Sequence, residues 1–398
     1  MRCSILIGKF NRKIVLFVFM IGTFAIGMTE YVVTGLLTQF ATDLHVEIAT
    51  TGLLLSVYAI SVAIFGPILR VITIKVNPKL LLICLTILFI VSNSIAAMAP
   101  NFEVLLLSRL LSAAMHAPFF GLCMSIAVAI SSPATKTSAL AAVNGGLTIA
   151  IMIGVPFGSY LGGMFDWRMV FLVIVVLGII TLLGLMIVTP NIKQTNPPSL
   201  KKELQIFKNK NVLLVIAIIV FGFSGVFTAY TFKEPILREY AGFDVSGITA
   251  ALFFFGLGAV ISNFLTGKIK PRLLTRSLMI ALIVLGIVLT VFTTLIQISG
   301  LTLVLCFLFG MGTFGTTPIL NSKIIISATE APSLAGTIAA SAFNLANAIG
   351  AVLGTVLLDA GFSYSTITYV ASAIVFFGLL LTLLMNKFED KSYFQDTH

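Results

Sequence analysis

The chain has 398 residues, of which 59% are hydrophobic and only 10% are charged, and its formal net charge is +10. A soluble domain carries about 25% charged residues, so this composition excludes a chain that presents most of its surface to water. The positive charge does not indicate a nucleic-acid partner, because such proteins gather their basic residues on one face or tail. Here the basic residues lie in short gaps between apolar runs, so the bilayer is the expected solvent.

A helix that crosses a bilayer needs about 20 largely apolar residues. Twelve runs of this kind follow one another along the chain, separated by charged residues, prolines and glycine turns. In chain order the predicted spans are residues 14–40, 48–70, 80–99, 102–130, 135–163, 169–188, 212–235, 246–267, 275–298, 301–327, 333–358 and 363–385. The predicted fold class is therefore an all-α membrane protein with twelve transmembrane helices.

The distribution of Lys and Arg predicts the orientation of these spans, because cytoplasmic loops carry an excess of both residues. With the N-terminus placed inside, all 24 Lys and Arg residues except Arg109, Arg168, Lys233 and Arg238 fall on the inner side. Arg168 and Arg238 fall on the outer side, whereas Arg109 and Lys233 fall within spans. We therefore expect a multi-pass protein of a bacterial-type plasma membrane with both termini in the cytoplasm.

The chain also repeats itself at an offset close to half its length. Residues 77–81 read Asn-Pro-Lys-Leu-Leu after the second span, and residues 270–274 read Lys-Pro-Arg-Leu-Leu after the eighth. The longest polar segment lies between the two copies and carries Pro197 and Pro198. We expect an N-terminal six-helix bundle (1–189), a cytoplasmic linker (190–211) and a C-terminal six-helix bundle (212–398), as in transporters built from parallel repeats.

Three ionisable residues in the first half are the candidates for a functional site. Glu30 lies inside the first span, where a charge costs roughly 2.5–3.5 kcal/mol on insertion scales. Such a carboxyl either binds and releases a proton or forms a structural ion pair. Arg109 and His116 are seven residues apart in the fourth span, so two helical turns place them on one face. At about 1.5 Å per residue, Glu30 and Arg109 lie at a similar depth in the bilayer.

Arg109 could bind an anionic substrate, tune the proton site, or serve only the structure. His116 titrates near neutrality and could relay protons, but a buried His that only packs between helices is as good a reading. In the second half, Lys233 marks either the membrane interface or a second charged site. Further side chains that could bind substrate through hydrogen bonds are Tyr31, Tyr230, Asn344 and Asn347.

Gly154, Gly158 and Gly162 form a small face at four-residue spacing in the fifth span, which permits close approach of another helix. Pro156 lies within this segment and removes a helical hydrogen bond. The fifth span has Ala150, Ile153, Gly154 and Gly158. The eleventh span repeats these residue types at the same spacing, with Ala346, Ile349, Gly350 and Gly354. These residues therefore predict tight helix packing at related places in the two halves.

Several of these patterns resemble the twelve-helix drug:proton antiporter branch of the major facilitator superfamily. Residues 27–35 read Gly-Met-Thr-Glu-Tyr-Val-Val-Thr-Gly, which is similar to the Thr-Glu-Phe/Tyr motif of its sugar-efflux, nucleoside-efflux and chloramphenicol-resistance-like exporters. Residues 109–121 resemble their Arg- and His-containing segment. Residues 154–158, followed by Gly162, resemble the antiporter signature, which in that family shapes the balance between outward and inward states.

One motif departs from the superfamily pattern. The loop after the second span usually carries Gly-x-x-x-Asp-Arg/Lys, whereas here Gly66 is followed four residues later by Arg70 with no Asp between them. In the superfamily, charged residues of this loop stabilise one conformation of the transporter. The acidic residue of that interaction is missing here.

The resemblance implies a secondary-active, proton-coupled exporter that moves a small organic molecule by alternating access. The alternative is a dedicated exporter of a polar or anionic metabolite (a sugar, nucleoside, amino-acid derivative or metallophore) rather than a multidrug pump. We expect no enzyme activity, no metal, no cofactor and no nucleic-acid partner, because the chain lacks a phosphate-binding loop and short-spaced metal ligands. The expected partners are the substrate, protons and the bilayer, and we expect the chain to act as a monomer.

Overall fold

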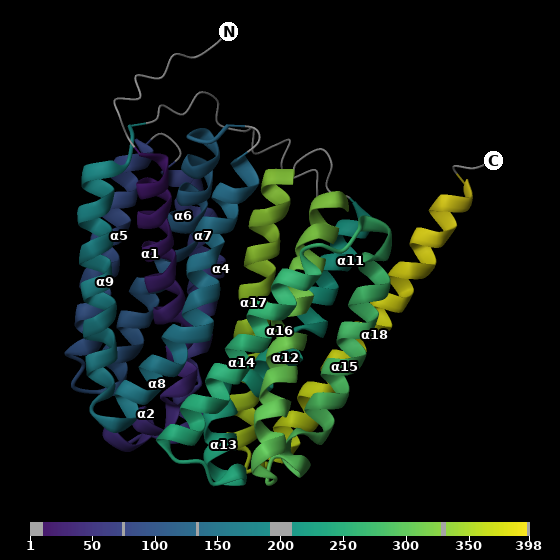
Figure 1. The fold of residues 1–398 in the computed structure, drawn as a ribbon. Helices are drawn as coiled ribbons and strands as arrows, with labels where there is room; N and C mark the ends of the chain where they lie inside the picture. The colour runs from purple at the N-terminus through teal and green to yellow at the C-terminus, as the bar shows by residue number, and fades with distance from the viewer. Residues whose placement is uncertain (1–10, 74–75, 133–134, 192–208, 328–331, 396–398) are drawn as a thin grey trace.

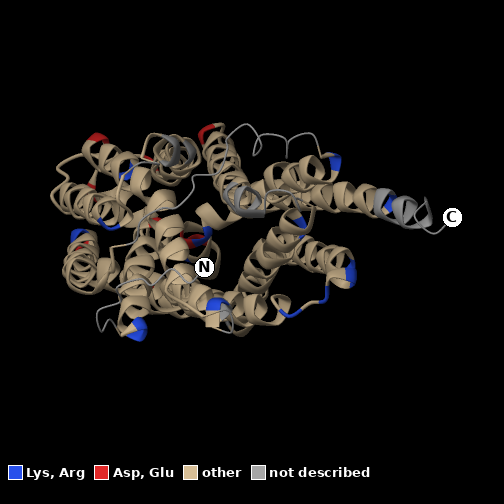
Figure 2. Cartoon of the chain, turned by 90° about the horizontal axis from the view of Figure 1, so that it is seen from above, with Lys and Arg blue, Asp and Glu red and all other residues tan. Residues whose placement is uncertain are grey.

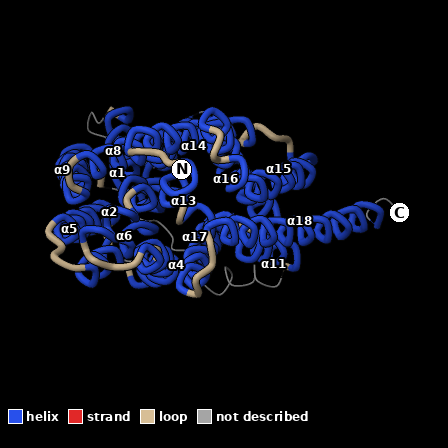
Figure 3. The backbone as a smooth tube through the Cα atoms, turned by 90° about the horizontal axis from the view of Figure 1, so that it is seen from below, coloured by secondary structure: helices blue, strands red, loops and turns tan. Residues whose placement is uncertain are grey.

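The computed structural model describes residues 11–73, 76–132, 135–191, 209–327 and 332–395. Within these residues all regular structure is helical (Figure 3), and twelve helices are long and apolar enough to cross a membrane. The all-α fold class and the predicted number of spans are therefore confirmed. Most of the predicted linker, including Pro197 and Pro198, lies outside the described residues.

The first half of the chain forms the helices at the left of Figure 1. They are α1 (Arg12–Tyr31), α2 (Leu37–Asp43), α3 (Ile48–Thr51), α4 (Leu53–Ile72), α5 (Pro78–Ala97), α6 (Phe102–Ala129), α7 (Lys136–Ile149), α8 (Val155–Met164) and α9 (Trp167–Val188).

The second half forms the helices at the right of the same view. They are α11 (Lys210–Ala217), α12 (Ser224–Thr231), α13 (Lys233–Ala241), α14 (Val245–Thr266), α15 (Leu274–Leu295), α16 (Ser299–Ser327), α17 (Pro332–Asp359) and α18 (Tyr364–Gln395). Both termini lie on the upper side of the molecule, which we call the termini side, and α2 and α13 lie near the opposite side.

The helices are apolar on both their buried and their exposed faces, as a bilayer requires. In α9, Phe171 is fully buried, whereas Leu172 is 52% exposed and Val176 is 54% exposed. In water such an exposed apolar face would promote association, but against lipid tails it carries no such cost. Lys and Arg lie mainly toward the rim when the chain is seen from the termini side (Figure 2).

The first span is not the single helix predicted for residues 14–40. Helix α1 ends at Tyr31, a 3₁₀ turn covers Val32–Gly35, and α2 starts anew at Leu37. The Gly35 carbonyl, which the break frees from regular helical bonding, accepts a hydrogen bond from Ser159 Oγ at 2.8 Å. A polar side chain from α8 thus stabilises an interruption that apolar periodicity does not reveal.

The predicted glycine face in the fifth span packs against the first span. A Cβ built at Gly158 would lie only 2.3 Å from Val32 Cγ2, and one at Gly162 would lie 2.5 Å from Leu36. Gly154 faces Met28 in the same way, one turn earlier. The span contains a π-helical turn at Ala150–Gly154, and Pro156, which removes one helical hydrogen bond, lies just after this turn.

The second half repeats this contact. A Cβ at Gly350 would lie 2.3 Å from the Ser224 carbonyl, and one at Gly354 would lie 2.6 Å from Phe232. The eleventh span therefore packs on the seventh through glycines, as the fifth packs on the first. The repeat seen in the sequence corresponds to equivalent helix contacts in the two halves.

Candidate functional site

A buried polar cluster joins three helices of the first half. Glu30, in the last turn of α1, is only 7% exposed, and its Oε2 lies 3.8 Å from Nδ1 of His116 in α6. The same imidazole nitrogen lies 3.1 Å from the hydroxyl of Tyr58 in α4. A carboxyl, an imidazole and a phenol thus lie within reach of one another inside the membrane-spanning region.

Arg109 extends this cluster from α6 and is 1% exposed. Its guanidinium carbon lies 4.4 Å from the centre of the Tyr58 ring, which is a cation–π distance. Nη1 donates to Thr29 Oγ1 at 3.2 Å, and Thr29 in turn donates to Asn93 at 2.6 Å. The Nε and Nη2 groups make no hydrogen bond.

The similar depth predicted for Glu30 and Arg109 agrees with this arrangement, since Arg109 binds Thr29, the residue before Glu30. No ion pair joins Arg109 to Glu30 among the residues that the structure describes. The basic residue beside Glu30 is His116, whose Nδ1 lies 3.8 Å from the carboxylate, so a structural ion pair of Glu30 with a basic residue stays a prediction beside the proton-binding role.

A second cluster lies where the two halves meet. Lys233 in α13 is 3% exposed, and its ammonium donates to Thr34 Oγ1 of the first half at 3.0 Å. The same ammonium lies 3.4 Å from the centre of the Tyr230 ring and 4.7 Å from that of Phe255. Lys233 makes no ion pair within the described part of the chain, so aromatic faces and one hydroxyl surround its buried amino group. Lys233 lies just beyond the membrane-spanning helix Lys210–Thr231 and is buried where the two halves meet.

Tyr31 lies between the two clusters. It follows Glu30 directly in the sequence, and its ring meets the Tyr230 ring edge to face at 6.3 Å and the Phe314 ring at 6.1 Å. Tyr230 is 1% exposed, and its ring also stacks beside Phe255 at 5.4 Å. The aromatic contact therefore links the carboxyl of the first half to the ammonium of the second half.

The two asparagines predicted to bind substrate lie on α17. Asn347 is buried and its Oδ1 has no hydrogen-bond partner. Asn344 uses its amide nitrogen on the Ala340 carbonyl of its own helix at 2.9 Å, and its Oδ1 is likewise without a partner. Both retain an acceptor for another group.

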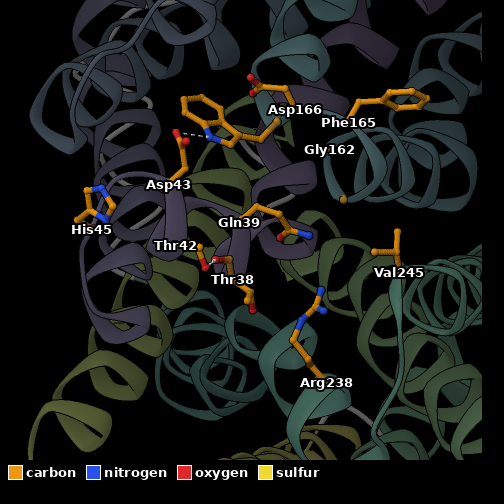
Figure 4. Close-up of a pocket in the computed structure, with 12 residues that line it drawn as sticks. Thr38, Gln39, Thr42, Asp43, His45, Gly162, Phe165, Asp166, Arg238 and Val245 are labelled. Atoms are coloured by element: carbon orange, nitrogen blue, oxygen red, sulfur yellow. Dashed lines mark hydrogen bonds between the residues drawn. The ribbon is translucent and has the colours of Figure 1, made fainter.

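A pocket of 530 Å³ opens at the boundary of the halves, near the side opposite the termini (Figure 4). Thr38, Gln39, Thr42 and Asp43 line it from the first half, and Arg238 and Val245 line it from the second. Burial opposes ionisation of Asp43, but hydrogen bonds from Arg168 and Trp167 outweigh it and lower the pKa of Asp43. Asp43 is therefore an ionised member of the pocket wall, paired with Arg168 at 2.7 Å.

Sequence reasoning missed Tyr58 and Thr34, the two side chains that connect the predicted residues. A lone Tyr in the apolar run 48–70 was a usable signal, because a phenol in a span needs a polar partner. Thr34 gave no such signal, since a Thr hydroxyl can bond its own helix. No group of three or more potential metal ligands occurs among the described residues.

The structure has twelve candidate membrane spans, with ionisable side chains buried between them. The sequence profile of the Major Facilitator Superfamily matches residues 19–340, and the chain belongs to this family. It is accordingly a transporter and not an enzyme.

Relatives and solved structures agree with this assignment. The chain is 45% identical to YfhI, an uncharacterized MFS-type transporter of Bacillus subtilis (strain 168), over 96% of both chains. It is 32% identical to the inner membrane transport protein YdhP of Escherichia coli (strain K12), over 92% of this chain and 94% of that one. Its fold is similar to that of a bacterial homolog of the human lysosomal transporter Spinster in an inward-facing, occupied conformation. That match has a TM-score of 0.68 at 15% identity and covers 94% of this chain and 97% of the other.

Proposed function

We propose that this transporter is a proton-coupled exporter of a small organic molecule. The observation that carries the proposal is the buried carboxyl of Glu30, with His116 3.8 Å away and no Arg or Lys in an ion pair with it among the described residues. An unneutralised carboxylate in a membrane span is costly. Protonation removes that cost, so Glu30 is suited to carry a proton between the two sides.

Alternating access would couple this proton to the substrate. The Glu30 cluster and the Lys233 cluster meet through Tyr31 and Tyr230, which belong to different halves. Rocking of one half against the other around a central site is the motion of this transporter class. Such a motion would change the distance between the carboxyl and the ammonium, and with it the proton affinity of Glu30.

A second candidate is a dedicated exporter of a polar or anionic metabolite. Two buried basic side chains, Arg109 and Lys233, make no ion pair with a carboxylate in the described part of the chain. Arg109 also retains two N–H groups without a partner. A planar anionic group could satisfy that fork, which favours an anion over a lipophilic cation.

The test compares a deletion strain with the same strain carrying the gene, by measuring metabolites inside the cells and in the medium. Complementation is expected to lower one compound inside the cells and raise it in the medium, and a protonophore is expected to abolish the difference. Accumulation inside the complemented cells would instead define an importer. Export that survives the protonophore would exclude proton coupling.

We further propose that both termini face the cytoplasm of a bacterial plasma membrane. The asymmetry of Lys and Arg supports this orientation. Reporter domains fused after Lys201 and after His398 are expected to show cytoplasmic activity only. An extracytoplasmic signal from either fusion would contradict the proposed topology.

A further inference from the structure

Glu234 is a fully buried acid that the proposed transport cycle does not yet use. It lies in the first turn of α13, directly after Lys233, and is 0% exposed. Its hydrogen-bond partners Thr38 and Arg238 belong to different halves and both line the pocket of Figure 4. Most acids in a membrane protein lie in loops, so a carboxylate buried here requires partners.

The partners of Glu234 come from both halves. Its Oε2 accepts hydrogen bonds from the Thr38 backbone N–H at 3.2 Å and from Thr38 Oγ1 at 2.7 Å. Its Oε1 accepts a hydrogen bond from Arg238 Nε at 2.9 Å. The Thr38 amide belongs to the first turn of α2, where helical N–H groups lack partners within their own helix. A carboxylate of the second half thus accepts a hydrogen bond from a backbone N–H in the first turn of α2, in the first half.

These contacts separate the pocket from the buried cations. Thr38 and Arg238 both line the pocket. Thr34, one helical turn before Thr38, binds Lys233, the neighbour of Glu234. A molecule moving between the pocket and Lys233 would therefore have to pass the Thr38–Glu234–Arg238 contact.

We propose that Glu234 is the gate residue that closes the transport pathway on the side opposite the termini. Its carboxylate fastens α13 to α2 in the conformation seen here, and breaking these hydrogen bonds would let the pocket connect to the Lys233 cluster. This inference rests on transport by alternating access as proposed above, but not on the coupling ion or the substrate. A second contact on the same side joins Thr355 Oγ1 to the Ala49 carbonyl at 3.1 Å, so the gate is part of a closed surface.

Glu234→Gln is the informative change because it preserves the size of the side chain. A glutamine has one acceptor oxygen, so its NH₂ group must face either the Thr38 N–H or Arg238, and both of these are donors. One charge-assisted contact is therefore lost whichever way the amide turns. Such bonds are strong, so the open-to-closed ratio is expected to rise about tenfold.

The measurement is the distance between spin labels on cysteines at Glu47 and Ala360, in protein whose four native cysteines are replaced by alanine. Both positions are exposed and lie near the α3–α17 contact between the halves. The parent protein is expected to show mainly a short distance, and Glu234→Gln is expected to add a longer one. Thr38→Val, which removes one of the two Thr38 bonds, is expected to have a smaller effect in the same direction.

The matched control is Glu239→Gln, which removes an exposed acid from the same helix and is expected to leave the distances unchanged. Unchanged distances in both Glu234→Gln and Thr38→Val would overturn the gate, as would an equal shift in Glu239→Gln. These outcomes are independent of the export assay. If export is driven by protons but the distances do not change, only the proposal for Glu234 is rejected. If the distances shift but export is not driven by protons, only the proposal of proton coupling is rejected.

Discussion

Replacing Arg109 with alanine is expected to lower the transport rate by roughly 100-fold or more while the protein still reaches the membrane. The physical reason is the unused half of the guanidinium, whose Nε and Nη2 groups have no partner in this conformation. Two charge-assisted hydrogen bonds to a substrate anion would account for a loss of this size. The measurement is export by cells or reconstituted vesicles, normalised to the amount of protein in the membrane.

Arg109→Lys is expected to recover little of this activity. A lysine keeps the charge but not the planar fork that stacks on Tyr58 at 4.4 Å and reaches Thr29 at the same time. Arg276→Ala, which removes an exposed arginine of α15, serves as the control and should retain export. Full transport by Arg109→Ala would remove Arg109 from the site.

Stability provides an independent check on this interpretation of Arg109. A buried charge with unsatisfied donors is destabilising. Arg109→Met should therefore melt at the same temperature as the parent protein, or higher, while losing transport. A large fall in melting temperature would show that Arg109 serves mainly to hold α6 against α1 and α4.

The sequence was sufficient to predict features that depend on one helix at a time. Apolar run length gave the twelve spans, and four-residue spacing identified Gly154, Gly158 and Gly162 as a packing face. Depth counted along two helices placed Arg109 near Glu30, and the contact with Thr29 agrees with it. Each of these depends on rise per residue or on helical period, which are fixed by the backbone.

The partners of these residues could not be predicted in the same way. Depth does not say which way a side chain points around its helix, so Tyr58 was not foreseen as the group between Arg109 and His116. The contact of Lys233 with Thr34 joins residues 199 positions apart in different halves. Such contacts depend on how the two halves meet, which the periodicity of a single span does not encode.

Breaks in helices were equally hidden. The run 14–40 is predominantly apolar and has no proline, yet the helix stops at Tyr31 and restarts at Leu37. The break places Thr34 and Thr38 on the short segment that meets α13. Its stabilising bond comes from Ser159, far along the chain, so no local signal marks it.

Glu30→Gln is expected to abolish uphill transport driven by a pH gradient while retaining downhill exchange of substrate. Glutamine has nearly the shape of a protonated glutamate but cannot release a proton, so it fixes one state of the cycle. Among the acids of the first half, Glu30 is buried in a span, whereas Asp43, Glu47, Glu103 and Asp166 are exposed near helix ends. It is therefore the acid of that half whose protonation changes the buried charge.

The neighbours of Glu30 link its protonation to the binding of substrate. Nδ1 of His116 lies 3.8 Å from the carboxylate and 3.1 Å from the Tyr58 hydroxyl, and Arg109 stacks on the same Tyr58 ring. An anion bound by Arg109 would place negative charge beside Glu30 and weaken the attraction of Arg109 for the carboxylate. Binding and protonation are thereby linked through one cluster, and a neutral glutamine would break the link.

Reconstituted vesicles with an imposed pH gradient measure the two activities separately. The parent protein should accumulate substrate against its concentration gradient, and Glu30→Gln should only equilibrate it, at a rate within about threefold of the parent exchange rate. Glu103→Gln, an exposed acid in the first turn of α6, is the matched control and should accumulate substrate normally. Undiminished accumulation by Glu30→Gln would transfer the coupling to His116, to Glu234 or to an ion other than the proton. Loss of both accumulation and exchange would instead place Glu30 in substrate binding, because a coupling group alone is not needed for downhill exchange.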